Sequence, residues 1–256
     1  MEAKGSDKPG ILPFRLVDKQ SKTVLLAAED ILDYFIAPDQ TPPDLVTFIG
    51  VQHLGAGRRT TKEAELQVVD RRGDCIGKYY LGRVRATLTR TPDMSDERYP
   101  EVPYDFFGFT EEFPEAGRIW QRWAAGGGPV ESGEWARVPA AWQESWLHVV
   151  QTSWFTTGRR ATRYLGGGTV VLDGSLITGR DAFYCALGEA VNGPRGYFGS
   201  NLDALFDCLR TARADGTAPF DLVWREQAAS RAALGADFTG AVLALLAKCG
   251  VTVRTG

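Results

Sequence analysis

The sequence contains few of the side chains that bind metals. It has two histidines, His53 and His148, and four cysteines with no C-x-x-C pair among them. Neither histidine lies near a cysteine or a pair of carboxylates at the spacing of metal ligands. We therefore expect no metal site and no cofactor. The cysteines are expected to be reduced, buried thiols of a cytoplasmic protein; they are Cys75, Cys185, Cys208 and Cys249.

Long apolar runs and an excess of charge are also missing. No run approaches the roughly 18 apolar residues that span a bilayer, and the N-terminal MEAKGSDKPG lacks the apolar core of a signal peptide. The net charge is −3. Residues 166–256 hold 9 acids and 8 bases, which leaves 23 acids and 21 bases in residues 1–165. An electrostatic field this weak favours neither nucleic acid nor a membrane as the partner. Because no segment would direct the protein out of the cell or into a bilayer, we expect a cytoplasmic protein.

The first part of the chain has the pattern of antiparallel strands. A hairpin is predicted over residues 14–26, and a second within residues 64–91, around a turn that contains Gly73. In the return strand of the second hairpin, apolar and polar residues alternate, as in a strand with one buried face. Residues 115–123 could form a short helix. We predict a β-rich α+β domain over residues 12–156, with no role indicated by the sequence.

Six of the seven tryptophans lie between residues 120 and 154. A helix is predicted over residues 139–154, with four large apolar side chains on one side: Trp142, Trp146, Val149 and Val150. It is interpreted as a core helix that closes the antiparallel sheet, and the alternative is an exposed aromatic docking surface. Residues 157–168 end in three glycines without the spacing of a phosphate-binding loop, and are predicted to be a linker.

The last part of the chain, residues 169–256, alternates short apolar strands with helical segments. The predicted order is strand, helix, loop, helix, strand, short helix, helix, strand. Strands separated by helices are typical of a parallel sheet packed with helices. The sequence therefore predicts a second domain of the α/β class.

The most informative stretch is residues 197–209, which reads YFGSNLDALFDCL. It begins as a glycine-rich loop, and Ser200 is the expected N-cap of a helix, with Asp203 three residues later. Asp203 and Asp207 are four residues apart, so their carboxylates are expected on one side of that helix. The apolar stripe lies on the other side and consists of Leu202, Leu205, Phe206 and Leu209.

The motif Y-F-G-x-N-L-D-A-L-x-D-C-L resembles that of the barstar family, which inhibits secreted guanyl-preferring ribonucleases of the barnase type. The resemblance covers roughly residues 165–256 and includes the strands expected at residues 170–174, 219–226 and 250–253. It implies a three-stranded parallel sheet packed with helices. It also implies an intracellular antitoxin or immunity protein that is not an enzyme and whose partner is a barnase-like ribonuclease.

The resemblance also implies roles for individual residues. Asp207 looks like the family's dominant anchor in the phosphate pocket of the nuclease, and Asp203 like the second carboxylate. Tyr197 resembles the aromatic residue that packs on the catalytic histidine, and Phe206 stands where the family often has tryptophan. The other expected interface positions are Phe198, Gly199, Asn201, Ala204 and Thr211. The last helix of the family can supply a further acid, but residues 240–248 contain none.

Three alternatives remain from the residues alone. The barstar-like domain could serve as an adaptor for a partner that is not a ribonuclease. Six arginines hint at nucleic-acid binding by the first domain, although a charged strand face is usually only solvated; they are Arg58, Arg59, Arg71, Arg72, Arg83 and Arg85. An enzymatic function is the least expected alternative, because the sequence shows no arrangement of Ser, Cys, His and Asp that is typical of catalysis.

Overall fold

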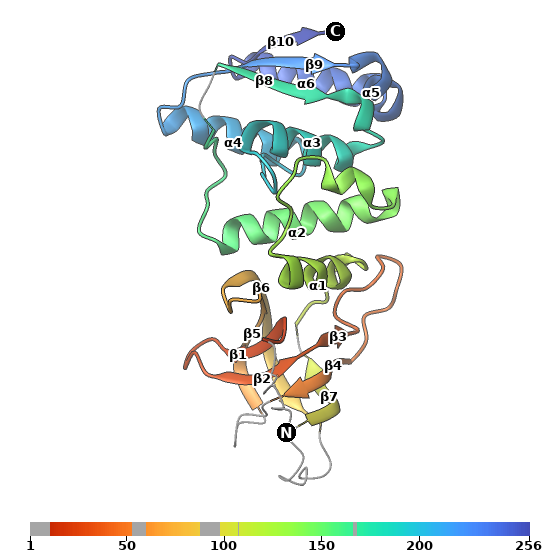
Figure 1. Ribbon diagram of the computed structural model, residues 1–256, viewed down its shortest axis with the longest axis vertical. Coiled ribbons are helices and arrows are strands. Elements are labelled where there is room, and N and C mark those ends of the chain that lie inside the picture. Colours follow the sequence, from red (N-terminus) through yellow and green to blue (C-terminus); the bar gives the residue numbers. More distant parts are fainter. Residues whose placement is uncertain (1–10, 53–59, 88–97, 107, 166–167) are drawn as a thin grey trace, which may run out of the picture. The chain divides into compact units, whose positions relative to one another are not determined.

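The computed structural model describes residues 11–52, 60–87, 98–106, 108–165 and 168–256 (Figure 1). The chain divides into two compact units, Met1–Gly128 and Pro129–Gly256. The boundary differs from the predicted one, which ended the first domain at residue 156.

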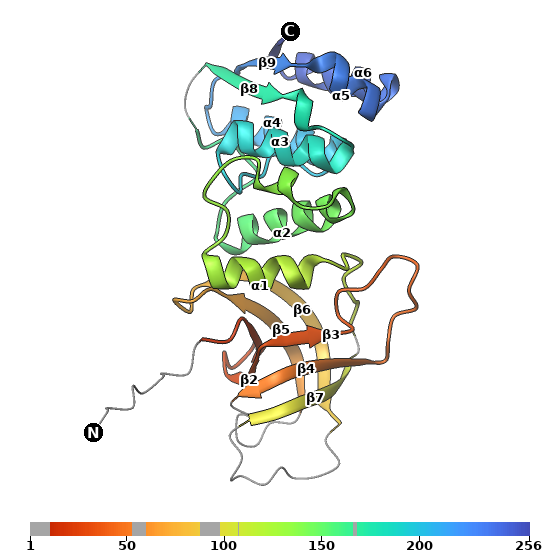
Figure 2. The ribbon, with the colours of Figure 1, turned by 45° about the vertical axis from the view of Figure 1, so that its right-hand side comes forward.

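The first unit is an antiparallel sheet of seven strands in the order β2-β1-β5-β6-β7-β4-β3 (Figure 2). Its strands are β1 (Phe14–Asp18), β2 (Val24–Ala28), β3 (Asp30–Leu32), β4 (Leu45–Gln52), β5 (Thr60–Val69), β6 (Cys75–Ala86) and β7 (Arg98–Phe106). Because Ala27 of β2 also pairs with Gln52 of β4, six of the strands close into a ring. The predicted hairpins are both present, as β1–β2 and β5–β6.

Helix α1 (Ala116–Gly126) supplies tryptophans to the core of the first unit. The Trp120 indole nitrogen donates a hydrogen bond of 2.7 Å to the hydroxyl of Tyr79 on β6. A Cβ on Gly77 would lie 2.8 Å from the Trp120 ring, so glycine is what allows this close approach. The helix that packs on the antiparallel sheet is therefore the short one near residue 120, and not the predicted helix over residues 139–154.

The arginines considered for nucleic-acid binding are partly engaged by acids of the same unit. Arg85 contacts Asp105 at 2.6 Å, and Arg72 lies 3.4 Å from both Asp70 and Asp74. Arg58 and Arg59 lie outside the described residues. Because ion pairs with exposed arginines are weak, the nucleic-acid alternative stays a prediction.

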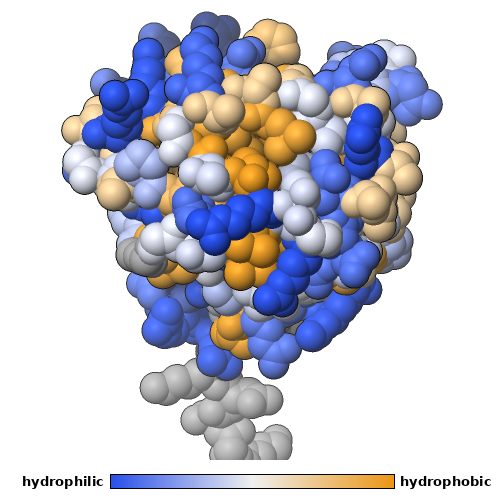
Figure 3. Space-filling view, turned by 90° about the horizontal axis from the view of Figure 1, so that it is seen from above, coloured by the Kyte–Doolittle hydropathy of each residue, from blue (hydrophilic) through white to orange (hydrophobic). Residues whose placement is uncertain are grey.

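The second unit contains a parallel sheet of three strands in the order β10-β9-β8 (Figure 1). Its strands are β8 (Thr169–Asp173), β9 (Asp221–Arg225) and β10 (Thr252–Thr255), and its later helices are α3 (Arg180–Asn192), α4 (Leu202–Ala214), α5 (Gln227–Leu234) and α6 (Ala236–Lys248). The predicted α/β class and element order are confirmed. Leu172, Leu222 and Trp224 are fully buried, whereas Val171 on β8 is 43% exposed. Figure 3 views the molecule from above and shows an apolar patch with polar and charged residues around it.

Helix α2 (Gln143–Thr156) belongs to the second unit and packs on α3. The prediction that it closes the antiparallel sheet is wrong. Its buried residues lie on most sides of the helix, as expected of a helix inside a core rather than on a surface; they are Gln143, Ser145, Trp146, Leu147, Val149, Val150 and Trp154. The apolar pattern of α2 correctly indicated that the helix is buried. It carried no information about which other element would cover the helix.

The segment after α2, predicted to be a linker, is held by hydrogen bonds over residues 157–165. The Trp154 indole donates to the carbonyl of Arg160 at 2.8 Å, and the Arg160 amide donates to the Tyr164 hydroxyl at 2.7 Å. The Tyr164 amide donates to the Asn192 side chain at 2.8 Å. We name residues 154–165 the latch. Gly166 and Gly167 lie outside the described residues.

All four cysteines are free; Cys185 and Cys208 are buried, and Cys75 and Cys249 are half-buried. Within the part of the chain that the structure describes, no single helix is long and apolar enough to cross a bilayer. Helices α5 and α6 meet that length and composition only as a pair, and the pair is bent by 119° at its break.

Candidate functional site

Helix α4 begins one residue later than predicted. Asn201 is the N-cap, with extended backbone, and its side-chain oxygen accepts a hydrogen bond of 2.8 Å from the Ala204 amide. The hydroxyl of Ser200 lies 3.4 Å from that of Tyr197. The predicted capping box of Ser200 and Asp203 is therefore wrong. Asp203 remains in the first turn, where a carboxylate suits the helix dipole.

The two carboxylates of the motif are exposed on α4, and the opposite side of the helix is buried. Asp203 and Asp207 are both exposed, whereas Leu205 and Cys208 are 0% exposed. Asp207 makes an ion pair of 3.3 Å with Arg210, and both side chains are more than half exposed. Such exposed pairs contribute about 0–1 kcal/mol, so Arg210 holds Asp207 only weakly. The arrangement gives two anions, one turn apart, on a rigid helix.

Basic side chains lie along α4, and one of them, Arg210, pairs with Asp207. Besides Arg210, Lys248 at the end of α6 places its Nζ 5.4 Å from the centre of the Phe206 ring. At the C-terminal end of α4, Arg160 makes an ion pair of 3.0 Å with Asp215. The last helix, α6, therefore brings the basic Lys248 beside α4, whereas the last helix of the barstar family can supply an acid.

The loop before α4 is buried, although its expected role in the interface requires side chains that a partner can reach. Tyr197 is 3% exposed and packs edge-on against Phe155, with ring centres 5.3 Å apart. Phe198 is fully buried and packs on Phe220. Gly199 is buried at a φ of 107°, a conformation that favours glycine. The rings of Tyr197 and Phe198 therefore do not lie at the surface, because α2 and the protein's own core occupy their faces.

The rest of the predicted interface is at least partly accessible. Asn201 is exposed, and Ala204, Phe206 and Thr211 are half-buried. With Asp203 and Asp207, these side chains form one continuous side of α4 and its N-cap. We name these six residues the α4 face.

The loop before α4 is held in place by two residues that the sequence analysis missed. The first is Asn192, at the end of α3. Its side-chain nitrogen donates to the carbonyls of Thr162 and Tyr197 at 3.0 and 2.9 Å, and its oxygen accepts from the Tyr164 amide. Asn192 is 7% exposed. One buried amide thus joins α3, the latch and the loop before α4.

Replacing Asn192 with alanine is expected to lower the free energy of unfolding by about 2–4 kcal/mol, because buried backbone groups of the latch and loop lose their partner. Urea denaturation measures this. The control Asn201→Ala removes only an exposed helix cap and should cost about 1 kcal/mol. Equal losses from the two variants would contradict the assignment.

Glu189 on α3 is the second of these residues and is 9% exposed. Its carboxylate accepts hydrogen bonds from the Gly133 amide at 2.6 Å and the Trp135 indole at 3.1 Å. The Arg195 amide of the loop also donates to it. Burial raises the pKa of Glu189 in spite of these three donors, which act in the opposite direction. Glu189 therefore ties the start of the second unit to the loop before α4.

The raised pKa of Glu189 predicts a pH dependence. A carboxyl whose pKa is higher in the folded state adds stability that is complete below its unfolded pKa and is lost as the pH rises through the folded value. Glu189→Gln keeps a hydrogen-bond acceptor but cannot titrate. We expect the stability advantage of the wild type over this variant to be larger near pH 4 than near pH 8, in urea denaturation across that range. Curves that stay parallel would refute this.

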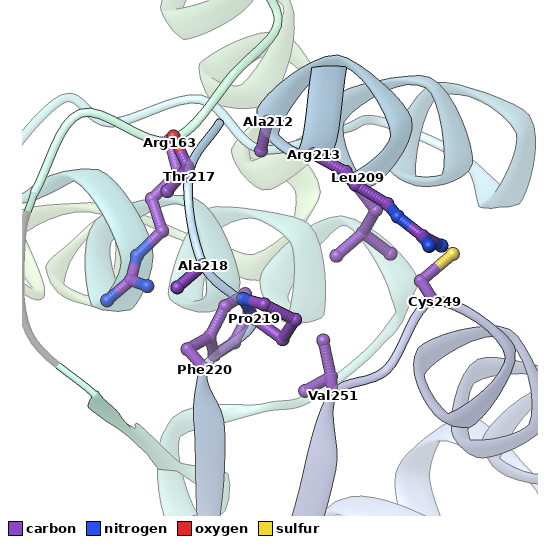
Figure 4. A pocket seen from close by; sticks show the side chains of 10 residues that line it. All are labelled: Arg163, Leu209, Ala212, Arg213, Thr217, Ala218, Pro219, Phe220, Cys249 and Val251. Atoms are coloured by element: carbon purple, nitrogen blue, oxygen red, sulfur yellow. The ribbon is translucent and has the colours of Figure 1, made fainter. Parts of the chain in front are cut away.

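A small pocket lies behind the C-terminal half of α4 (Figure 4). Its lining combines apolar side chains with two arginines and a thiol: Arg163, Leu209, Ala212, Arg213, Thr217, Ala218, Pro219, Phe220, Cys249 and Val251. The Arg163 guanidinium turns away from Cys249 and lies 4.8 Å from the centre of the Phe220 ring. Among the described residues, no three His, Cys, Asp or Glu side chains form a group that could hold a metal ion.

Comparison with known families identifies the last third of the chain. Residues 168–252 match the family described as Barstar (barnase inhibitor), so the chain carries a Barstar family domain and the resemblance is confirmed. Residues before 168 are not part of that match. A search of curated proteins found no match.

Proposed function

We propose that the Barstar family domain makes this protein an intracellular inhibitor of a guanyl-type ribonuclease, that is, an antitoxin or immunity protein. The observation that carries the proposal is the pair of exposed carboxylates, Asp203 and Asp207, on the helix that forms the second part of the family motif. The protein itself catalyses no reaction in this proposal. It acts in the cytoplasm, where an active ribonuclease would harm the cell that makes it.

The mechanism is occlusion of a cationic cleft. A ribonuclease presents Arg, Lys and His side chains to the phosphodiester of RNA. Two anions a helical turn apart can make charge-assisted hydrogen bonds with those groups and exclude the substrate. The weak, exposed Asp207–Arg210 pair is a small obstacle, because it is replaced by stronger pairs in a desolvated interface.

Inhibition of barnase by the intact protein tests the proposal. RNA cleavage by a fixed amount of barnase is measured while the protein is added up to a large molar excess. We expect cleavage to fall to background near an equimolar ratio. Full cleavage at high excess would overturn the proposal for nucleases of the barnase type.

The second candidate is an adaptor whose Barstar family domain binds a protein that is not a ribonuclease. Two observations favour it: Tyr197 is buried, and Lys248 lies beside α4. Affinity capture with the intact protein distinguishes the two functions. Recovery of a partner without nuclease activity, lost when Asp203 and Asp207 are both changed to alanine, would support the adaptor.

A further inference from the structure

We infer that Phe155, contributed by α2 from outside the Barstar family match, is the aromatic residue that this protein presents to the cationic cleft of its partner. This rests on the proposed function and names a further specificity-determining residue for it. Phe155 then serves in the position that the family resemblance gives to Tyr197.

Phe155 is accessible to a partner, whereas Tyr197 is not. Tyr197 is 3% exposed, whereas Phe155 is 45% exposed. Their ring centres lie 5.3 Å apart with the planes at 65° to each other, so Phe155 covers Tyr197 and is itself open to solvent. A partner that approaches this side of the loop meets Phe155 before it can reach Tyr197.

The backbone around Phe155 is held by its neighbours. It follows Trp154, whose ring is 2% exposed and whose indole donates to the Arg160 carbonyl. The latch is bonded in turn to Asn192, which also donates to the Tyr197 carbonyl. These bonds fix the backbone on both sides of Phe155, and its ring is packed against Tyr197.

Tyr197 connects Phe155 to the start of α4. The Tyr197 hydroxyl lies 3.4 Å from that of Ser200, the residue just before the N-cap of α4. Burial raises the pKa of Tyr197 to about 12, and the nearby charge of Asp207 acts in the same direction. Tyr197 thus lies between Phe155, whose ring it contacts, and the charge of Asp207. An aromatic face near a carboxylate suits a flat cation, an imidazolium or a guanidinium, held by cation–π and charge attraction together.

The experiment measures binding of barnase to the full-length protein by calorimetry. Phe155→Ala should weaken binding about tenfold, as loss of an aromatic anchor does. Phe155→Tyr should bind like the wild type. Phe109→Ala makes the same change at a phenylalanine of the first unit that is 92% exposed, and should alter binding by less than about twofold. Tyr197→Phe removes only the hydroxyl that lies 3.4 Å from that of Ser200, and it should also alter binding by less than about twofold.

The outcomes separate this inference from the proposed function. Wild-type binding that Asp207→Ala weakens and Phe155→Ala leaves unchanged would refute the role of Phe155 alone. Tighter binding by Phe155→Ala would also refute it, because Phe155 would then block Tyr197. Absence of any binding by the wild type would refute the proposed function. A melting temperature recorded for each variant shows whether a loss of binding merely reflects unfolding.

Discussion

Replacing Asp207 with alanine is expected to weaken binding to barnase by roughly 30-fold to several-thousand-fold, or about 2–5 kcal/mol, the cost of truncating one partner of a desolvated charge pair. That range of binding free energies includes values for barnase–barstar complexes themselves. Stability should hardly change, because Asp207 is 58% exposed and its ion pair with Arg210 is exposed as well. Calorimetry and thermal unfolding of the same samples measure the two effects.

Asp237→Ala is the matched control for this variant. Asp237 is also exposed and lies in the first turn of α6, in the same unit but away from the α4 face. We expect it to leave the affinity within about twofold of the wild-type value. Equal losses from Asp207→Ala and Asp237→Ala would mean that net charge, and not the α4 face, governs binding. A large fall in melting temperature for Asp207→Ala would assign that carboxylate a structural role.

The sequence predicted residues 169–256 of the second unit well, because the signals there are local. The apolar stripe of α4 and the spacing of Asp203 and Asp207 follow from helical geometry within one short segment. The observed burial of Leu205 and Leu209 and the exposure of both carboxylates agree with it. The error in the N-cap is local too: two adjacent polar residues, Ser200 and Asn201, are both good caps, and contact with Tyr197 engages the first.

The role of α2 could not be predicted, because it depends on contacts far apart in the sequence. An apolar helix reveals that it is buried, but not that Phe155 will meet Tyr197 or that Glu189 will bind Gly133 and Trp135. Glycines near residue 166 also suggested a free linker, although the bonds that fix residues 157–165 come from Trp154 and Asn192. The exposed part of the candidate site was therefore predictable, and the buried part of it was not.

Replacing Gly188 with alanine is expected to destabilise the protein by about 2–3 kcal/mol, the cost of forcing an atom into a full core. Gly188 lies within α3, where alanine normally favours the helix by roughly 0.5–1 kcal/mol. Here a Cβ would overlap the carbonyl oxygen of Gly196 in the loop before α4. The atoms that this Cβ would meet belong to the backbone of Gly196 and Phe198, so they cannot rotate away as a side chain would. The loop must therefore shift, and binding through the α4 face should weaken as well.

Gly240→Ala tests whether this cost belongs to the contact or to glycine in general. Gly240 lies within α6, is exposed, and has open space where its Cβ would be. The same substitution should raise the free energy of unfolding there by roughly 0.5–1 kcal/mol, so the two variants should differ in sign in urea denaturation. Stabilisation by Gly188→Ala would show that α3 and the loop do not touch. The close approach of these two backbones would then no longer explain how the α4 face is held.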